Sequence, residues 1–218
     1  AELGPTPLIG FAGAPFTVAS YMVEGGPSRD HLRTRALMRS QPEVWARLAA
    51  WVAELSGRFL RAQVLAGASS VQLFDSWVGA LSEEMYLGHV QQHSSAVFGQ
   101  VADLPVSRTH FGVGAAHLLP QMWEAGATAM GIDHRLRLDH ALEILPAGTP
   151  VQGNIDPAVL FTSEQARFAE ADAVLAAGAG ASGHVVNLGH GVPPDADPQV
   201  LTDLVSYLHS QSEAPGAA

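Results

Sequence analysis

The chain has 218 residues, of which 47% are hydrophobic, and its 11 basic residues are all arginine. This is enough apolar material for one substantial core, so a disordered protein is excluded. The absence of lysine excludes Schiff-base chemistry, and the absence of cysteine excludes disulfides, thiolate zinc sites and a cysteine nucleophile. A net charge of −10 argues against nucleic acid as a partner, because phosphate binding needs a basic surface.

Two further features of the composition indicate the compartment and the surface. No apolar run reaches the roughly 18 residues of a membrane-spanning helix, and the first residues lack the pattern of a signal peptide. We therefore expect a cytoplasmic protein with no membrane partner. Seven arginines fall between Arg29 and Arg61, and we interpret most of them as part of a solvated helix face.

Short, apolar, β-prone runs bounded by glycine, proline or polar residues predict buried strands. Helical patterns separate these runs, and this alternation is typical of a parallel α/β architecture. The predicted strands are Leu8–Ala12, Ser70–Phe74, Val106–Phe111, Ala129–Ile132, Pro150–Gln152 and His184–Leu188.

The strongest helical pattern runs from Glu43 to Ala66. Its predicted buried stripe consists of Val44, Leu48, Trp51, Val52, Leu55, Phe59 and Ala62. Thr162 and Gln165 form the pattern of a capping box, and we expect a disordered tail at 213–218. Shorter helices are expected at Ser28–Arg39, Ser82–Val101, His117–Ala125, Arg137–Leu145, Thr162–Ala177 and Pro198–His209.

The order of elements predicts a single α/β domain over residues 1–212, built as part of a (β/α)8 TIM-type barrel. A closed barrel needs eight strands and usually about 250 residues, whereas this chain supplies six of the eight βα units. No glycine-rich phosphate-binding pattern follows the first strand, which disfavours a doubly wound nucleotide-binding sheet. We therefore expect a partial barrel that exposes two strand edges and apolar interior side chains.

Unusual polar residues come directly after four of the predicted strands. In an α/β barrel these positions converge on the face that carries active sites. The sequence therefore predicts one site assembled from distant stretches of the chain. The stretches are GFAGAPFTVASYMVEGG (10–26), QLFDSWVG (72–79), VQGNIDP (151–157) and VNLGHGV (186–192).

In this order and at these spacings, the four stretches resemble the uroporphyrinogen decarboxylase family in its bacterial form. HFGVGA (110–115) and GIDHR (131–135) are similar to further segments of that family, with His134 where the family usually has tryptophan. The resemblance spans residues 7–209 and implies a C-terminal portion that lacks an N-terminal segment. It also implies a lyase that needs no cofactor and removes the four acetate carboxyl groups of uroporphyrinogen III, yielding coproporphyrinogen III in haem biosynthesis.

The resemblance implies that Tyr21, Ser76 and His190 bind this anionic tetrapyrrole. A phenol, a hydroxyl and an imidazole can each donate a hydrogen bond to a carboxylate. Two of them have simpler interpretations, Tyr21 as a half-buried aromatic residue and Ser76 as a turn or capping residue. Glycines on both sides of His190 leave space for a ligand, so a purely structural role fits His190 less well.

Other polar residues on the same rim have two interpretations. Asp75, Gln152, Asn154 and Asp156 could contact the substrate or could fix neighbouring loops by hydrogen bonds, and we expect the two aspartates to be structural. A separate pair, His89 and His93, has the spacing of a metal-binding pair on a helix. The sequence indicates no third ligand, so we predict no metal site.

The resemblance places the catalytic aspartate and an arginine cluster in the missing N-terminal segment. A chain with a net charge of −10 needs cations from elsewhere to hold many carboxylates. We therefore expect no catalytic residue in this chain and little or no activity from the chain alone. A homodimer is expected from the resemblance only.

Two alternatives stay open. One is a truncated, non-catalytic paralogue that binds a tetrapyrrole or a full-length partner, which the shortage of strands favours. The other is a methyltransferase of the same barrel superfamily, which is disfavoured because those enzymes hold zinc with histidine and cysteine and this chain has no cysteine.

Overall fold

A single parallel sheet organises the chain. The structure, a computed structural model, describes residue 4 and residues 6–212, so the predicted tail at 213–218 lies outside the described residues. The sheet order is β1-β2-β3-β4-β5-β6, so neighbours in the sheet are also neighbours in the chain. All six predicted strands are confirmed. They are β1 (Ile9–Gly13), β2 (Ser70–Asp75), β3 (Ser107–Gly112), β4 (Ala129–Gly131), β5 (Val151–Gln152) and β6 (His184–Val185).

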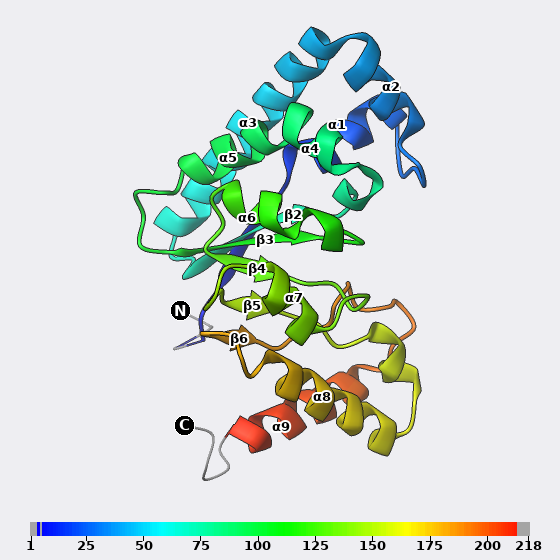
Figure 1. The fold of residues 1–218 in the computed structure, drawn as a ribbon. Coiled ribbons are helices and arrows are strands. Elements are labelled where there is room, and N and C mark those ends of the chain that lie inside the picture. The colour runs from blue at the N-terminus through cyan, green and yellow to red at the C-terminus, as the bar shows by residue number, and fades with distance from the viewer. Residues whose placement is uncertain (1–3, 5, 213–218) are drawn as a thin grey trace.

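Helices alternate with the strands, as the sequence predicts, and pack around the curved sheet (Figure 1). Short 3-10 turns lie at Val78–Ala80, Ala116–Leu118 and Pro157–Phe161. No helix in the described ranges is long and apolar enough to cross a membrane. The α-helices are α1 (Pro15–Glu24), α2 (Leu32–Ser40), α3 (Pro42–Leu65), α4 (Glu83–His89), α5 (Gln91–Gly99), α6 (Leu119–Glu124), α7 (Leu138–Ile144), α8 (Glu164–Gly178) and α9 (Pro198–Ser212).

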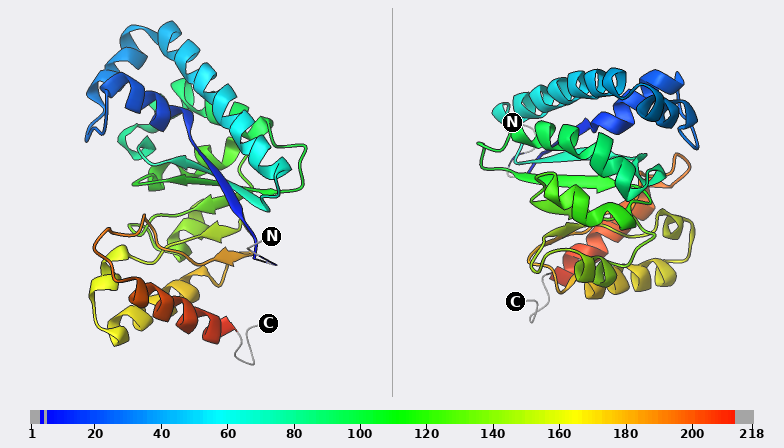
Figure 2. Two further views of the ribbon diagram at one scale, coloured as in Figure 1. Left: turned by 180° about the vertical axis from the view of Figure 1, so that it is seen from behind. Right: turned by 45° about the horizontal axis from the view of Figure 1, so that its top comes forward.

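The sheet stays open across the described residues. β1 and β6 each pair with a neighbour on one side only, and Figure 2 shows them as the two margins of a curved arc. Inward-facing Ile9 and Phe11 on β1 are 41% and 57% exposed, and Val185 on β6 is 53% exposed. The expected partial barrel, with two open edges and an exposed apolar interior, is therefore confirmed.

Aromatic rings tie the first three strands together on the inner face. Phe74 makes edge-to-face contacts with Phe11 and Phe111, at ring-centroid distances of 5.7 Å and 5.8 Å. Residues that alternate along parallel strands point to the same face, which brings these three rings from different strands into one row. The row defines the floor of the inner face.

The predicted buried stripe of α3 is wrong except at Val52, which is fully buried, and Leu48, which is partly buried. Trp51, Leu55 and Phe59 are 57%, 55% and 55% exposed, whereas the buried face consists of Trp45, Ala49, Val52, Ala53, Ser56, Gly57 and Leu60. The small residues of that face let α3 approach its neighbours closely, because a Cβ on Gly57 would collide with Gln100 of the turn after α5. Periodicity could not decide between two apolar faces of one helix.

Three other helix predictions need correction. Helix α1 was not predicted, although Pro15 and the left-handed Gly25 are ordinary start and stop signals. The single helix expected at Ser82–Val101 is two helices that break at Val90. The break has a physical cause, since the His89 carbonyl accepts from the indole of Trp45 at 2.8 Å rather than continuing the helix.

The cap of α8 is Ser163 and not Thr162. The Ser163 hydroxyl accepts from the backbone N–H of Ala166 at 3.3 Å. The Thr162 hydroxyl donates instead to the Val159 carbonyl at 2.7 Å, within the preceding 3-10 turn. Serine and threonine both cap helices well, and Thr162 and Ser163 are adjacent. The sequence pattern therefore could not decide between them, and the prediction of Thr162 is wrong.

Two neighbouring residues test the corrected orientation of α3. Leu60→Ala should lower the free energy of unfolding of the chain by about 3 kcal/mol, because Leu60 is fully buried. Phe59→Ala removes a larger side chain but should cost less than about 1 kcal/mol, because its ring is mostly exposed. Urea unfolding followed by circular dichroism measures both values. The reverse order would support the stripe that the sequence predicted.

Candidate functional site

The three predicted substrate-binding residues come from three strand ends on one side of the sheet. Tyr21 lies on α1 after β1, and Ser76 follows β2 directly. His190 follows a short extension of β6. In this extension Leu188 forms a parallel β-bridge with Ile155, and the Gly189 N–H donates to the Ile155 carbonyl at 2.8 Å. Because the strands are parallel, all three residues lie at the carboxyl end of the sheet.

A buried hydrogen-bonded clip holds the ends of β1 and β2 in register. The Thr17 hydroxyl donates to Oδ1 of Asp75 at 2.9 Å and accepts from the backbone N–H of Trp77 at 3.2 Å. Asp75 is fully buried, and its second oxygen lies 3.9 Å from Nε2 of the buried His110. The clip therefore fixes α1 against the loop that carries Ser76.

Aromatic stacking sets the position of Tyr21. Its ring stacks on Trp77 with centroids 3.9 Å apart, and His31 lies 4.5 Å from the indole of Trp77. His31 has a left-handed backbone with φ of 50°, which is uncommon for a residue other than glycine. Burial lowers the pKa of His31, and nearby Glu24 and Asp30 only partly offset this effect, so the ring is neutral at pH 7.

A hollow of about 400 Å³ opens beside Ser76 and Trp77. Arg29 and Arg35, from the segment between α1 and α2 and from α2 itself, line it together with Arg135, which follows β4. We call this cavity the arginine hollow. It was not predicted, because the sequence favoured a solvated helix face for most arginines of this region.

Asp133 fixes the third arginine. Its Oδ2 accepts from Nη1 of Arg135 at 2.7 Å and from the backbone N–H of Gly114 at 2.7 Å. The carboxylate is almost buried, whereas the side chain of Arg135 remains 54% exposed. The ion pair therefore orients the guanidinium and leaves part of it open to a ligand.

Two glycines let the loops at the strand ends approach one another. A Cβ on Gly79 would collide with the carbonyls of Val113 and Gly114, and a Cβ on Gly189 would collide with the backbone of His134. Gly189 thus serves to bring the loop of His190 against the loop after β4. Its role is packing rather than the space for a ligand that the sequence suggested, while Gly191 has open space beside it.

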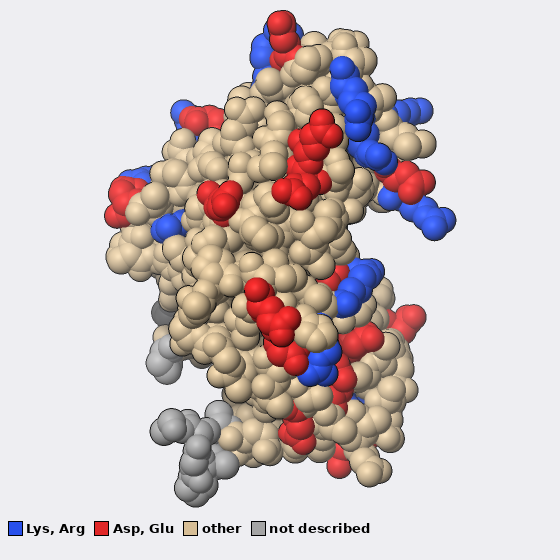
Figure 3. Space-filling model, in the orientation of Figure 1, with Lys and Arg blue, Asp and Glu red and all other residues tan. Residues whose placement is uncertain are grey.

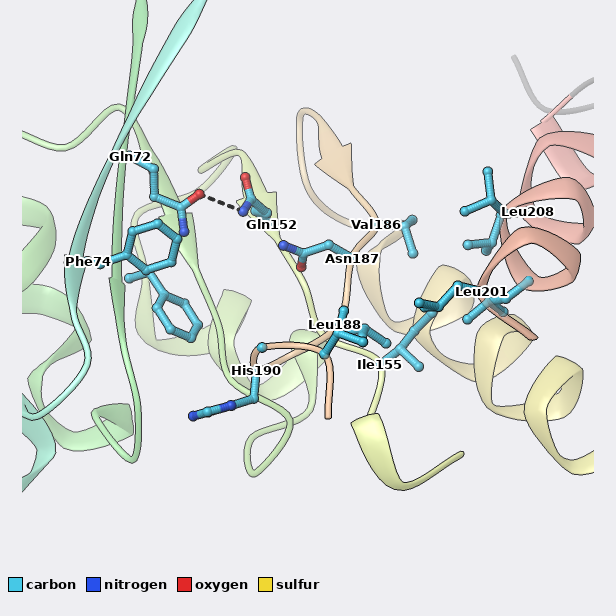
Figure 4. A pocket seen from close by; sticks show the side chains of 15 residues that line it. Gln72, Phe74, Gln152, Ile155, Val186, Asn187, Leu188, His190, Leu201 and Leu208 are labelled. Atoms are coloured by element: carbon cyan, nitrogen blue, oxygen red, sulfur yellow. Dashed lines mark hydrogen bonds between the residues drawn. The ribbon is translucent and has the colours of Figure 1, made fainter. Parts of the chain in front are cut away.

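A second cavity, the interior groove, runs along the inner face of the sheet toward α9 (Figure 4). Gln72 and Phe74 line one side, and the apolar side chains of Val186, Leu188, Leu201, Leu204, Val205 and Leu208 line the other. His190 lies at the rim of the groove and points away from the leucines. The groove is mostly apolar, with the amides of Gln72, Gln152 and Asn187 and the imidazole of His190 among its lining groups.

A third cavity, the rim hollow, connects the other two. It shares Arg135 with the arginine hollow and shares His190, Gly191 and Val192 with the interior groove. Ser76 and His190 therefore lie in different cavities that meet through the loop after β4, so the single site that the sequence predicted is divided between them. Tyr21, 47% exposed, lies on the far side of Trp77 from His31 and borders the same end of the sheet.

The remaining polar residues of the rim mostly hold the scaffold. Nε2 of Gln152 donates to Oε1 of Gln72 across the inner face at 2.8 Å. Asn154 donates to the carbonyls of Asp133 and Leu136, which fixes the loop after β4. Asp156 accepts from the backbone N–H of Ala158 at 2.9 Å and caps a 3-10 turn. With the buried Asp75, these contacts match the structural interpretation of both aspartates.

The histidine pair does not form a helical metal motif. His89 ends α4 and His93 lies on α5, so the break at Val90 separates them. His93 is buried, and burial lowers its pKa. Among the residues that the structure describes, no group of three or more histidine, aspartate or glutamate side chains is arranged to hold a metal ion.

Removal of one hydroxyl tests the clip. Thr17→Val keeps the shape of the side chain but leaves Asp75 and the Trp77 N–H without this partner, so the free energy of unfolding should fall by about 2 kcal/mol. Thr109→Val is the matched control, because Thr109 is also buried and its hydroxyl makes no hydrogen bond to the described residues. Urea unfolding measures both. An equal, small effect of the two substitutions would contradict the role of the clip.

Comparisons with known proteins agree with the motifs. The family model for uroporphyrinogen decarboxylase (URO-D) matches residues 1–211. A protein named uroporphyrinogen decarboxylase from Streptomyces avermitilis is 55% identical over 212 residues, covering 97% of this chain and 60% of that protein. One of the same name from Salinispora tropica is 53% identical over 216 residues, covering 99% and 58%. The chain thus spans about three-fifths of the length of these relatives, and it belongs to the uroporphyrinogen decarboxylase family.

Proposed function

We propose that this chain forms the larger part of an enzyme that decarboxylates uroporphyrinogen III to coproporphyrinogen III. The observation that carries the proposal is the convergence of Tyr21, Ser76 and the loop of His190 at one end of a parallel sheet. The relatives of this chain are named for this activity, and the chain spans about three-fifths of their length. The activity needs no metal or organic cofactor in this proposal.

The three residues would act as hydrogen-bond donors to substrate carboxylates. The Ser76 hydroxyl lines the arginine hollow, and the imidazole of His190 borders the mouth of the interior groove. The Tyr21 ring is held by Trp77 with its surface half exposed. A tetrapyrrole carries its carboxylates around its periphery, so donors spread along a rim suit it better than donors gathered in one pocket.

The chemistry follows from the substrate itself. Protonation of a pyrrole carbon beside an acetate arm makes the ring an electron sink. The C–C bond to the carboxylate then breaks, CO2 leaves, and the electron pair forms an exocyclic C=C bond that neutralises the cationic ring. A proton adds to the exocyclic carbon to make the methyl group, and loss of the first proton from the ring carbon restores the aromatic pyrrole. The protein must supply a carboxylate that stabilises the cationic pyrrole and donors that hold the remaining carboxylates.

The carboxylates at the strand ends are already engaged, and Asp30 lies among the arginines of the arginine hollow, which supports a catalytic aspartate from outside this chain. Asp133 pairs with Arg135, Asp75 is buried against Thr17, and Asp156 caps a turn. The open edges of β1 and β6 support a further proposal, that two more βα units complete the barrel. We therefore propose that the chain alone binds tetrapyrrole but does not turn it over.

A direct comparison of two polypeptides tests the proposal. The full-length gene product should convert uroporphyrinogen III to coproporphyrinogen III, whereas the 218-residue chain should show less than about 1% of that rate, because it lacks the carboxylate that stabilises the transition state. Chromatography of the oxidised porphyrins measures both rates. Turnover by the short chain at the full rate, or none by the full-length product, would contradict the proposal.

A histidine substitution in the full-length product tests the binding role. His190→Ala should raise the KM for uroporphyrinogen about tenfold, since it removes a charge-assisted hydrogen bond. His140→Ala, on the exposed surface of α7, should leave the KM unchanged. Equal KM values for both variants would remove His190 from the substrate site.

A homodimer is also proposed, and the exposed apolar face of α3 supports an interface there. Trp51 and Leu55 lie more than half exposed on one side of this helix. Trp51→Glu should shift the full-length product from dimer to monomer in sedimentation equilibrium, because it places a charge in an apolar contact. An unchanged dimer would place the interface elsewhere, and a wild-type monomer would refute the dimer.

A further inference from the structure

We propose that the arginine hollow is a second carboxylate-binding subsite, in which Arg29 and Arg35 hold one peripheral carboxylate of the tetrapyrrole. The next carboxylate along the edge of the tetrapyrrole reaches Ser76. The inference rests on the proposed function and assigns the substrate contacts on the side of α2. It adds cations from within this chain to the donors Tyr21, Ser76 and His190. Figure 3 shows basic side chains on both sides of the indentation between the two halves of the molecule.

The charges of the hollow are unbalanced in favour of an anion. Arg29, Arg35 and Arg135 line it, and Asp30 is the one carboxylate among its described lining residues. Neither Arg29 nor Arg35 forms an ion pair with a described carboxylate, whereas Arg58, Arg61 and Arg137 each pair with an acidic side chain. Two guanidinium groups without such partners, facing the same cavity, can bind a carboxylate with paired N–H donors.

The walls of the hollow fix the helix that carries Arg35. Arg35 lies on the first turn of α2, where its N–H donates to the carbonyl of His31 at 2.9 Å. The Glu24 carboxylate accepts from both the N–H and the hydroxyl of Thr34 at 2.9 Å, which anchors α2 to the end of α1. His31 and Trp77 form the aromatic side of the cavity. The position of Arg35 thus depends on the same stack that orients Tyr21.

The described lining of the interior groove offers no arginine to the carboxylates of the substrate. The interior groove is lined by amides and apolar side chains, with His190 as its one titratable residue. A polycarboxylate held by neutral donors alone would be opposed by the net charge of −10. The arginine hollow opens on the side of Ser76 and reaches the rim hollow through Arg135, so it lies within the path that a planar polyanion would cover.

A binding experiment tests the subsite with the full-length gene product. The double variant Arg29→Gln and Arg35→Gln should bind uroporphyrin I, a stable octacarboxylate, about tenfold more weakly, which corresponds to about 1.4 kcal/mol. Quenching of tryptophan fluorescence reports binding, because Trp77 lines the hollow. The matched control is Arg39→Gln with Arg47→Gln, two exposed arginines outside the hollow that remove the same charge.

Further variants separate the subsite from folding and from general attraction. Thermal melting should be the same for both double variants, and Arg35→Lys should recover part of the affinity because it keeps a positive charge. Equal weakening by the variant and its control would overturn the inference in favour of long-range attraction. Inorganic phosphate at constant ionic strength could also displace the porphyrin equally well from the wild-type product and from the Arg29→Gln and Arg35→Gln variant. That result would show a general anion site and would overturn the inference.

The binding experiment can fail or succeed independently of the proposed decarboxylation. Porphyrin binding requires no turnover, so a full-length product that binds through Arg29 and Arg35 but decarboxylates nothing would contradict the reaction and support the subsite. Decarboxylation with an unchanged Kd and KM in the double variant would contradict the subsite and support the reaction.

Discussion

The parallel register of six strands is the constraint on which the site depends. Backbone hydrogen bonds between neighbours fix which residues end each strand, and Ser76, Asp133 and the loop of His190 follow from those ends. A one-residue slip would turn Gln72 and Phe74 to the opposite face of the sheet. The clip from Thr17 to Asp75 and the contact between Gly189 and His134 then draw the loops together. Local side-chain contacts refine a geometry that the sheet has already set.

Much of the fold was predictable because strands and caps leave local signals. All six strands, the parallel order and the open edges followed from apolar runs and their spacing. The errors arose where tertiary contacts decide between local alternatives. The indole of Trp45 donates to the His89 carbonyl where the predicted helix breaks. Helix α3 buries a face that mixes Trp45 and Leu60 with small residues, and exposes the apolar face of Trp51, Leu55 and Phe59. Neither event has a signature within a window of neighbouring residues.

The places of the candidate site residues in the fold were predictable, whereas the charges beside them were not. Motifs located Tyr21, Ser76 and His190, whereas the arginines beside them have no motif and come from a segment that reads as a solvated helix. Their convergence depends on the left-handed turn at His31 and on the docking of α2 through Glu24. A chain of strongly negative net charge can still present a local cationic surface to an anionic ligand. Net charge alone therefore did not predict that three arginines of this chain line one cavity.

A crystal structure of the full-length gene product with bound coproporphyrin tests the central claim most directly. We expect a tetrapyrrole across the carboxyl ends of the strands, with carboxylates beside Ser76 and His190 and the ring over the mouth of the interior groove. A tetrapyrrole at the opposite end of the sheet, or one that contacts neither residue, would contradict it.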